Sequence, residues 1–440
     1  MLPKSRRDSG APAGAAFPGI AGTSSGVTIT PDGVLLTEEP RMERLRTVPL
    51  ALAGVLFAWG ASVGSDWTRW RGPEGTGISA ENDWKPLAVA SPKVKWKMNV
   101  GVGHSSFSVA GKALYTMGNV AEKDIIYCLD AETGKETWRF SYPCASGNYK
   151  GTRATPVLDG DSLYTLGRDG DAHCLDAKTG KVKWQTNLMK QHGSAAGTWG
   201  MAGSPLILGA MVVYNARAAG LALDKATGKK VWETGGGPCG YASPVAFKLG
   251  AKECLAVFGN QEITVTDATN GKRVFSHPWK TQYDVNAADP VFFDNKLFIT
   301  SGYEHGCALL DVSGKNIKEL WTNLNMRGHF ASPIYLDGHL YGVDGNTGTG
   351  QLKCLDAKTG QVKWSQGGSF ENLMMAAGKI IAVDKKGDLV VAEASPAGYK
   401  EIARGVVLNG QTTNWTAPVL ANGLIYCRNS EGDVVCVDVR

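Results

Sequence analysis

The sequence predicts an all-β protein, an eight-bladed β-propeller whose blades are four-stranded antiparallel sheets. Three observations lead to this prediction. A short segment that ends in an aromatic residue recurs at intervals of roughly 45 residues, a period typical of propellers. Each interval holds four short stretches in which apolar and polar residues alternate between turn residues. Glycine is abundant, with 56 residues in a chain of 440, as many tight turns require.

The repeated segment is clearest at residues 174–184, which read CLDAKTGKVKW. Related segments occupy 128–138, 222–232, 265–275 and 354–364, and a looser copy with two extra residues occupies 309–321. The first unit begins at Ser106, and a gap of double length before the last unit indicates a degenerate unit at 369–411. The other units begin with a residue followed by proline, at Thr155, Ser204, Ser243, Asp289, Ser332 and Ala417.

Each unit resolves into four strands. In the second unit we expect strands at 154–158, 162–167, 171–176 and 181–188. Asp-Gly and Thr-Gly-Lys turns supply the left-handed backbone positions that tight hairpins need. No helical stretch is expected after residue 65. A solenoid and a set of tandem sandwiches are the alternative architectures for a repeat of this length.

The two ends of the repeat region complement each other. The eighth unit, residues 416–440, stops after its third strand at 434–438. An orphan strand at 94–98 precedes the first unit. We expect this strand to complete the last blade and close the ring, because closure leaves no inner edge open.

The aromatic residue of each repeat is expected to lie on the outer strand and to pack flat against the neighbouring blade. The docking residues are Trp96, Trp138, Trp184, Trp232, Phe275, Trp321 and Trp364. The first position of the segment must be small, and it is Ala222 once and cysteine at Cys128, Cys174, Cys354 and Cys436. These cysteines lie on different blades, so we interpret them as small apolar core residues and expect no metal site. The nine cysteines are odd in number, and a disulfide between Cys144 and Cys239 is left open.

Charge and motifs exclude several function classes. The net charge is +5, and the basic residues form no stripe that would follow a phosphate backbone, so nucleic acid is not an expected partner. The chain contains no zinc-protease, nucleotide-binding or serine-hydrolase motif. We expect a monomer.

The N-terminal region divides into three parts. Residues 1–41 are rich in Gly, Ala, Ser and Pro, and we interpret them as disordered or as a mis-assigned start. Residues 42–64 have a basic start, an apolar run from Val48 to Trp59 and small residues after it, the pattern of a secretory signal. The apolar run is too short for a membrane span, although a buried helix and an uncleaved anchor are alternatives. The protein is therefore expected in the periplasm or outside the cell, with an arm at 65–91 and the propeller at 92–440.

The repeat, with its pattern Ala-x-Asp-x-x-Thr-Gly-x-x-x-Trp, resembles the tryptophan-docking motif of PQQ-like repeat propellers. This family includes quinoprotein alcohol dehydrogenases and also BamB-like outer-membrane assembly factors that bind no quinone. The resemblance covers about residues 92–440. The segment from Asp66 to Pro73 is similar to the N-terminal arm of secreted PQQ-like proteins of unassigned role.

Candidate ligand-binding residues lie in the links between blades, which end beside the innermost strands and so surround the mouth of the central channel. Long turns at 303–305 and 344–350 overhang it. Aromatic, guanidinium and carboxamide groups there suit a planar anionic or polar ligand, although the same residues would also plug and hydrate a channel. The candidates are His104, Lys150, Arg153, Trp199, Tyr241, Asp284, Asn286, Arg327, His329, Glu371, Asn372, Asn414 and Trp415.

We expect an exported, non-catalytic scaffold that binds an envelope protein or a small polar ligand at this funnel and needs no cofactor. The resemblance also implies an alternative, a dehydrogenase that uses PQQ and calcium to oxidise alcohols or sugars. Oxygen ligands of the right type for calcium are present at Asp284, Asn286, Glu371 and Asn372. Two departures weigh against it: the chain has no adjacent cysteine pair and no long insertion that would build a lid.

Overall fold

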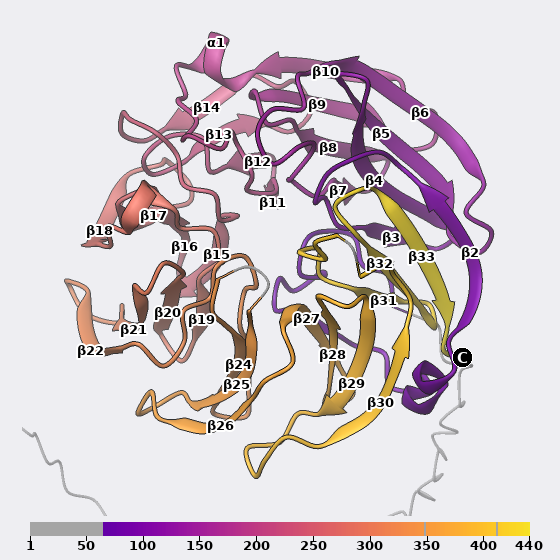
Figure 1. Cartoon of the computed structure of the whole chain (residues 1–440). Helices are drawn as coiled ribbons and strands as arrows, with labels where there is room; N and C mark the ends of the chain where they lie inside the picture. The colour runs from indigo at the N-terminus through magenta and orange to yellow at the C-terminus, as the bar shows by residue number, and fades with distance from the viewer. Residues whose placement is uncertain (1–64, 347–348, 411) are drawn as a thin grey trace, which may run out of the picture. The chain divides into compact units, whose positions relative to one another are not determined.

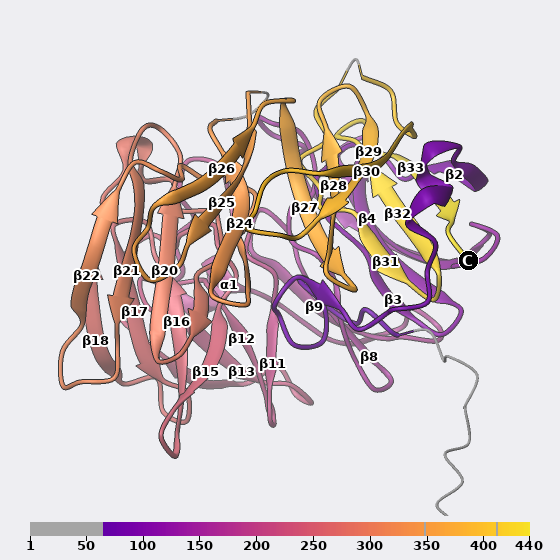
Figure 2. The same ribbon diagram turned by 90° about the horizontal axis from the view of Figure 1, so that it is seen from below.

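Eight antiparallel sheets form a closed ring in the computed structural model, which describes residues 65–346, 349–410 and 412–440. The prediction of an eight-bladed propeller is confirmed. Figure 1 looks down the ring, and Figure 2 shows the blades from the side. The interpretations of residues 1–41 and 42–64 fall outside the described residues. Within the part of the chain that is described, no helix combines the length and apolarity needed to cross a membrane.

The first four blades follow the chain in order, from the innermost to the outermost strand. Blade 1 contains β3 (Ser108–Ala110), β4 (Ala113–Val120), β5 (Lys123–Asp130) and β6 (Glu136–Pro143). Blade 2 contains β7 (Val157–Asp159), β8 (Ser162–Leu166), β9 (Asp171–Asp176) and β10 (Val182–Asn187). Blade 3 contains β11 (Leu206–Leu208), β12 (Met211–Tyr214), β13 (Leu221–Asp224) and β14 (Lys230–Glu233). Blade 4 contains β15 (Val245–Leu249), β16 (Lys252–Phe258), β17 (Glu262–Asp267) and β18 (Arg273–Pro278).

The remaining four blades complete the circle. Blade 5 contains β19 (Val291–Phe293), β20 (Lys296–Ser301), β21 (Gly306–Asp311) and β22 (Lys318–Asn323). Blade 6 contains β23 (Ile334–Leu336), β24 (His339–Asp344), β25 (Gln351–Asp356) and β26 (Val362–Gln366). Blade 7 contains β27 (Phe370–Ala376), β28 (Lys379–Asp384), β29 (Asp388–Glu393) and β30 (Glu401–Val406). Blade 8 contains β31 (Val419–Ala421), β32 (Leu424–Arg428), β33 (Asp433–Asp438) and, from the other end, β2 (Lys93–Asn99).

Two features depart from the sequence expectations. The stretch after β10 forms a short helix, α1 (Leu188–His192), and two short 3₁₀ segments occur, η1 (Pro86–Ala90) and η2 (Gln282–Asp284). Helix α1 forms because the Asn187 side chain accepts from the backbone N–H groups of residues 189 and 190 and Gly193 ends the turn at φ 62°. The arm also adds a strand, β1 (Ile78–Ser79), which pairs in parallel with the inner strand of blade 7.

The repeated segment builds the same turn in blade after blade. The Asp130 carboxylate accepts hydrogen bonds from the backbone N–H of residue 132 and from the N–H and hydroxyl of Thr133. These bonds lower the pKa of Asp130, the Thr133 hydroxyl contributing most. Gly134 then adopts φ 71°, in the left-handed region that glycine favours. The spacing of Asp, Thr and Gly therefore predicts a hairpin turn whose backbone N–H groups are bonded by the turn's own aspartate.

The docking residues contact the turns of the next blade. The Trp138 indole donates to the carbonyl of Ala177 over 3.0 Å, and its ring covers Gly180, where a Cβ would come within 2.6 Å of the ring. Across the sheet, Trp138 faces the small Cys128, and a register shift follows this pair. Equivalent N–H bonds to the next blade are made by Trp96, Trp184, Trp232 and Trp364. The glycine of the repeat is thus required twice, for its backbone angle and for the ring above it.

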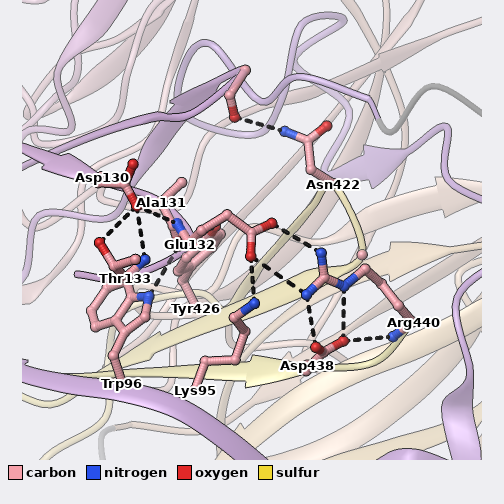
Figure 3. Close-up of polar contacts among 12 residues, drawn as sticks. Lys95, Trp96, Asp130, Ala131, Glu132, Thr133, Asn422, Tyr426, Asp438 and Arg440 are labelled. Atoms are coloured by element: carbon pink, nitrogen blue, oxygen red, sulfur yellow. Dashed lines mark hydrogen bonds and ion pairs between the residues drawn. The ribbon is translucent and has the colours of Figure 1, made fainter. Parts of the chain in front are cut away.

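The N-terminal strand closes the ring, as predicted. β2 pairs antiparallel with β33 from Lys93 opposite Asp438 to Asn99 opposite Asp433. Figure 3 shows the polar contacts around this junction, where Lys95 and Arg440 both bond to the Glu132 carboxylate of blade 1. The last blade is therefore made from both ends of the described chain.

A buried arginine ties blade 8 to blade 1 near this closure. Arg428 is 1% exposed and donates to the carbonyls of Ser105, Met117 and Gly101 and to the hydroxyl of Thr116. Burial lowers its pKa to about 9, because the charged form loses hydration. Carbonyl oxygens, and no carboxylate of the described residues, compensate this charge.

The residues that precede the inner strands of blades 1 to 5 each bond to the next blade around the channel. The backbone N–H of Ser106 donates to Thr155, and the N–H of Thr155 donates to the Ser204 hydroxyl over 2.9 Å. The series continues to Ser243 and then to Asp289. From there, the Asp289 N–H donates to the hydroxyl of Ser332. We call this series the inner ring. It explains why a hydroxyl precedes proline in most units.

All nine cysteines are buried free thiols, and none forms a disulfide. The open pairing of Cys144 with Cys239 is not made. Cys128, Cys174, Cys354 and Cys436 lie in the apolar clusters between blades, in agreement with their interpretation as small core residues.

Candidate functional site

A pocket of about 200 Å³ occupies the centre of the ring, where the links between blades approach the inner strands. Its wall comes from several blades, because most links deliver one or two side chains just before the inner strands. Among the residues predicted from the sequence, it contains His104, Arg153, Trp199, Tyr241, His329, Asn372 and Trp415. The fold therefore gathers residues that are far apart in the chain into one concave site.

The N-terminal arm supplies one part of this pocket. Trp70 lines it, and its indole N–H donates to the carboxylate of Asp289 over 2.6 Å. The next residue, Arg71, is buried and donates to the carbonyls of Ser332 and Pro333. Asp289 belongs to the inner ring, so Trp70 lies at the level where the inner strands begin. We call the pair of Trp70 and Asp289 the floor of the pocket.

Aromatic rings form a continuous series along the wall. Trp415 stacks on His104 with ring centroids 4.9 Å apart and contacts Phe330 at 4.7 Å. Phe330 stacks on His329, which meets the edge of Tyr303. On the other side, Tyr149 lies 6.1 Å from Trp415 and 5.3 Å from Trp199. Such a wall offers ring faces and edges to a ligand that itself carries a ring.

Arg153 is the cation of the pocket wall. Its guanidinium donates to the carbonyls of Gly151, Asn148 and Tyr149, at 2.9 to 3.0 Å. It forms no ion pair with a carboxylate of the described residues. Burial is the main cause that lowers its pKa, to about 10, so the group stays charged at neutral pH. Asp124 and Asp169 act on this charge only from a distance, so the guanidinium lines the pocket without a carboxylate in direct contact.

The pocket histidines are neutral at physiological pH. Burial, with the nearby charges of Arg153 and Arg428, lowers the pKa of His104 to about 3. Burial alone lowers the pKa of His329 to about 4. Both rings therefore act as uncharged aromatic surfaces, and Arg153 carries the positive charge of this wall.

Comparison with known proteins identifies the family. The family model described as outer membrane protein assembly factor BamB matches residues 121–366, more than half of the chain. The chain belongs to this family. No curated protein matches the sequence.

Solved structures share the propeller of this BamB family member. BamB from Moraxella catarrhalis superposes with a TM-score of 0.60 and 15% identity, covering 79% of this chain and 99% of that one. The quinohemoprotein alcohol dehydrogenase from Comamonas testosteroni gives a TM-score of 0.64 and 14% identity, over 85% of this chain and 80% of that one. A quinohemoprotein alcohol dehydrogenase from Pseudomonas putida HK5 gives 0.63 and 13%, with the same coverage. At these identities the likeness shows the fold alone.

Several predicted residues of this BamB family member lie outside the pocket wall because their polar groups have other partners. Asn286 is fully buried, and its amide donates to the carbonyls of Gly259, Asn260 and Trp279. The Asn414 amide donates to the carbonyl of Asp384. These two carboxamides satisfy buried backbone groups where strands end.

The charged residues of the predicted set are also engaged or remote. Arg327 bonds to Asp344 over 2.9 Å and to Glu304. Glu371 accepts from the backbone N–H of residue 414 and lines a small cavity next to the pocket. Asp284 contacts Gln261 at the exposed surface, and Lys150 is exposed and does not line the pocket. None of them adds charge to the pocket wall.

The calcium ligands considered from the sequence do not converge in this propeller. Asn372 donates to the carbonyl of Trp415 over 2.6 Å, and Asp284, Asn286 and Glu371 have the separate partners given above. Asp289 is the carboxylate that lines the pocket, and both of its oxygens already accept hydrogen bonds. No group of three His, Cys, Asp or Glu residues in the described ranges is placed to hold a metal. This donor set does not fit a quinone-bound calcium.

The sequence reasoning left Trp70, Asp289 and Phe330 out of the site. Asp289 did carry a signal, since it is the one acidic residue at a position that other units fill with Thr, Ser or Ala. Trp70 carried none, because the arm lies outside the repeat and its path across the channel follows from tertiary contacts.

Proposed function

We propose that the protein is an exported, non-catalytic binding propeller whose central pocket holds a small polar ligand that carries a ring and an anionic group. The observation that carries this proposal is Arg153, a guanidinium in an aromatic wall without a carboxylate partner among the described residues. A carboxylate, sulfate or phosphate of a ligand would supply the missing counter-charge through a charge-assisted hydrogen bond.

The aromatic series supports the same ligand class. Tyr149 lies within ring-contact distance of both Trp415 and Trp199, beside Arg153. A planar ring would bury its faces against these side chains while its anionic group meets the guanidinium. The pairing of one cation with several rings favours ligands with one anionic group over compact, multiply charged anions.

The composition of the wall supports binding without catalysis. General acid or base catalysis needs a group whose pKa lies near the working pH. His104 and His329 have pKa values of about 3 and 4, and the Asp289 oxygens both accept hydrogen bonds from the protein. An exported location is proposed from the signal-like segment at 42–64 and from the outer-membrane description of the family.

Isothermal titration with benzoate and naphthalene-2-carboxylate tests the proposal, with benzamide as the uncharged counterpart. We expect the acids to bind and Arg153→Gln to weaken them roughly tenfold or more, because a charged hydrogen bond is lost. Arg139→Gln, at an exposed site on β6, is the matched control. Equal binding of acids and benzamide, or no binding of any ring anion, would contradict the proposal.

The dehydrogenase alternative is tested separately by adding PQQ and Ca²⁺. Because the calcium donors do not converge, we expect calcium not to strengthen PQQ binding and alcohols not to reduce a dye. Calcium-dependent binding with dye reduction would establish the alternative instead.

A protein partner is the second candidate, and exposed tyrosines at the pocket rim favour it. Tyr149 is 61% exposed and Tyr283 is 60% exposed, and both adopt left-handed backbone angles that are costly for such residues. Tyr283 meets the edge of Tyr303, which lines the pocket. Cross-linking in envelope extract, compared between the wild type and the double variant Tyr149→Ser and Tyr283→Ser, tests this candidate. A cross-linked partner that persists in the variant would exclude the rim.

A further inference from the structure

Position 289 differs chemically from the rest of the inner ring. At the equivalent positions Thr155, Ser204, Ser243 and Ser332, one side-chain oxygen accepts the N–H of the preceding blade. Oδ1 of Asp289 does the same for the N–H of Ser243 over 2.7 Å. A serine would satisfy this bond equally well. The second carboxylate oxygen is therefore not needed by the inner ring.

That second oxygen binds Trp70. Oδ2 of Asp289 accepts the indole N–H over 2.6 Å. Trp70 belongs to the arm, so the extra oxygen connects the arm to the channel. The presence of a carboxylate at this one unit is thereby explained by a contact with a residue outside the repeat.

The arm is fixed on both sides of Trp70. Before it, the backbone of Trp67 pairs with Val109 of blade 1. After it, Arg71 is held by the carbonyls of Ser332 and Pro333 in blade 6, at 3.0 and 2.8 Å. β1 then joins the sheet of blade 7. The backbone N–H of Leu158 in blade 2 also donates to the carbonyl of Thr68. Because blades 2 and 6 face each other in a ring of eight, the arm is a strap across the channel with Trp70 between these anchors.

We propose that Trp70, held by Asp289, is the specificity-determining residue of the central pocket: it closes the channel and limits the length of ligand that the pocket admits. The limit on ligand length rests on the proposed function, whereas the closure of the channel by Trp70 does not. A ligand whose anionic group meets Arg153 extends its ring toward the floor, and the indole stops it there. Entry and exit then occur only from the face that carries the links between blades.

A series of acids of increasing length tests the limit on the folded, full-length protein. The probes are benzoate, naphthalene-2-carboxylate and biphenyl-4-carboxylate, measured by isothermal titration. For the wild type we expect biphenyl-4-carboxylate to bind more weakly than naphthalene-2-carboxylate. Trp70→Ala is expected to reverse this order and to strengthen the longest acid at least tenfold. Trp70→Phe keeps a ring at the floor and is expected to restore the order of the wild type.

A second measurement needs no ligand. Asp289→Ser keeps an acceptor for the Ser243 N–H, so the inner ring remains bonded. It removes the partner of Trp70 and, with it, the carboxylate whose charge favours the buried Arg71 of the same arm. We expect trypsin to cleave the arm of this variant after Arg69 or Arg71 at least tenfold faster than in the wild type, while circular dichroism still shows the folded propeller. Ser243→Ala, which removes an inner-ring hydroxyl but leaves the floor, is the matched control and is expected to lack this acceleration.

The outcomes separate the two proposals. If the wild type binds the acids and Trp70→Ala leaves their order unchanged, the length limit is overturned while the proposed function stands. If no acid binds the wild type, the proposed function fails, and the trypsin comparison alone decides whether Asp289 holds the floor. Equal cleavage of Asp289→Ser and the wild type overturns that assignment.

Discussion

Removing the indole of Trp96 is expected to lower the free energy of unfolding by about 3 to 5 kcal/mol, the range found for truncating a large buried aromatic residue. Trp96 is 7% exposed, and its N–H donates to the carbonyl of Ala131 over 2.9 Å. The hydrogen bond accounts for about 1 kcal/mol of this loss. The rest comes from the ring, which covers Gly134 so closely that a Cβ there would come within 2.6 Å of it. A glycine has no side chain to refill the space.

The measurement is a urea titration of Trp96→Ala followed by circular dichroism. Trp321→Ala is the matched control, since Trp321 occupies the same position in blade 5 and covers Gly360. Trp321 is only half-buried, and its indole N–H has no partner among the described residues, so a smaller loss is expected. Our account of ring closure would be refuted if Trp96→Ala cost less than about 1 kcal/mol or no more than Trp321→Ala.

Two further predictions concern protons and thiols. Burial lowers the pKa of His173 to about 4, whereas an unfolded histidine titrates near 6.5, so the unfolded state binds more protons and stability falls as the pH falls from about 6.5 to 4. Denaturant titrations at several pH values measure this decline in the free energy of unfolding. His173→Gln should remove up to roughly 3 kcal/mol of the decline. The same dependence on pH in the variant and the wild type would contradict the prediction. Burial also raises the pKa of all nine thiols, so Ellman's reagent should find none reactive in the native protein and all nine after unfolding, and a lower final count would reveal a disulfide.

The fold was predictable because its determinants are local and repeated. Asp130, Thr133 and Gly134 form their turn with one another. Because these residues are close neighbours in the sequence, their spacing alone predicts the hairpin. The docking tryptophan follows at a fixed distance and contacts the next copy of the same turn. Even the closing strand was visible, since Trp96 carries the docking aromatic without the rest of its unit.

The site was less predictable because the direction of a link side chain depends on its tertiary partners. Arg153 and Asn286 both lie in links and both donate to three backbone carbonyls, yet Arg153 lines the pocket whereas Asn286 is fully buried outside it. Their positions in the links place both residues near the channel. The sequence does not show which buried backbone carbonyls each side chain will have as hydrogen-bond partners. The arm presents the same difficulty, because the partner of Trp70 lies more than two hundred residues away in the chain.

The pairing of β2 with β33 has a consequence for synthesis. Residues 93–99 are synthesised long before their partner at 433–438. Until that partner is made, the strand at 93–99 has no neighbour in the last blade, and the circle stays open with an unpaired edge. The waiting period spans about 340 residues of translation, some tens of seconds at ordinary rates. A nascent chain of this kind benefits from a chaperone that covers the early strand until its partner emerges.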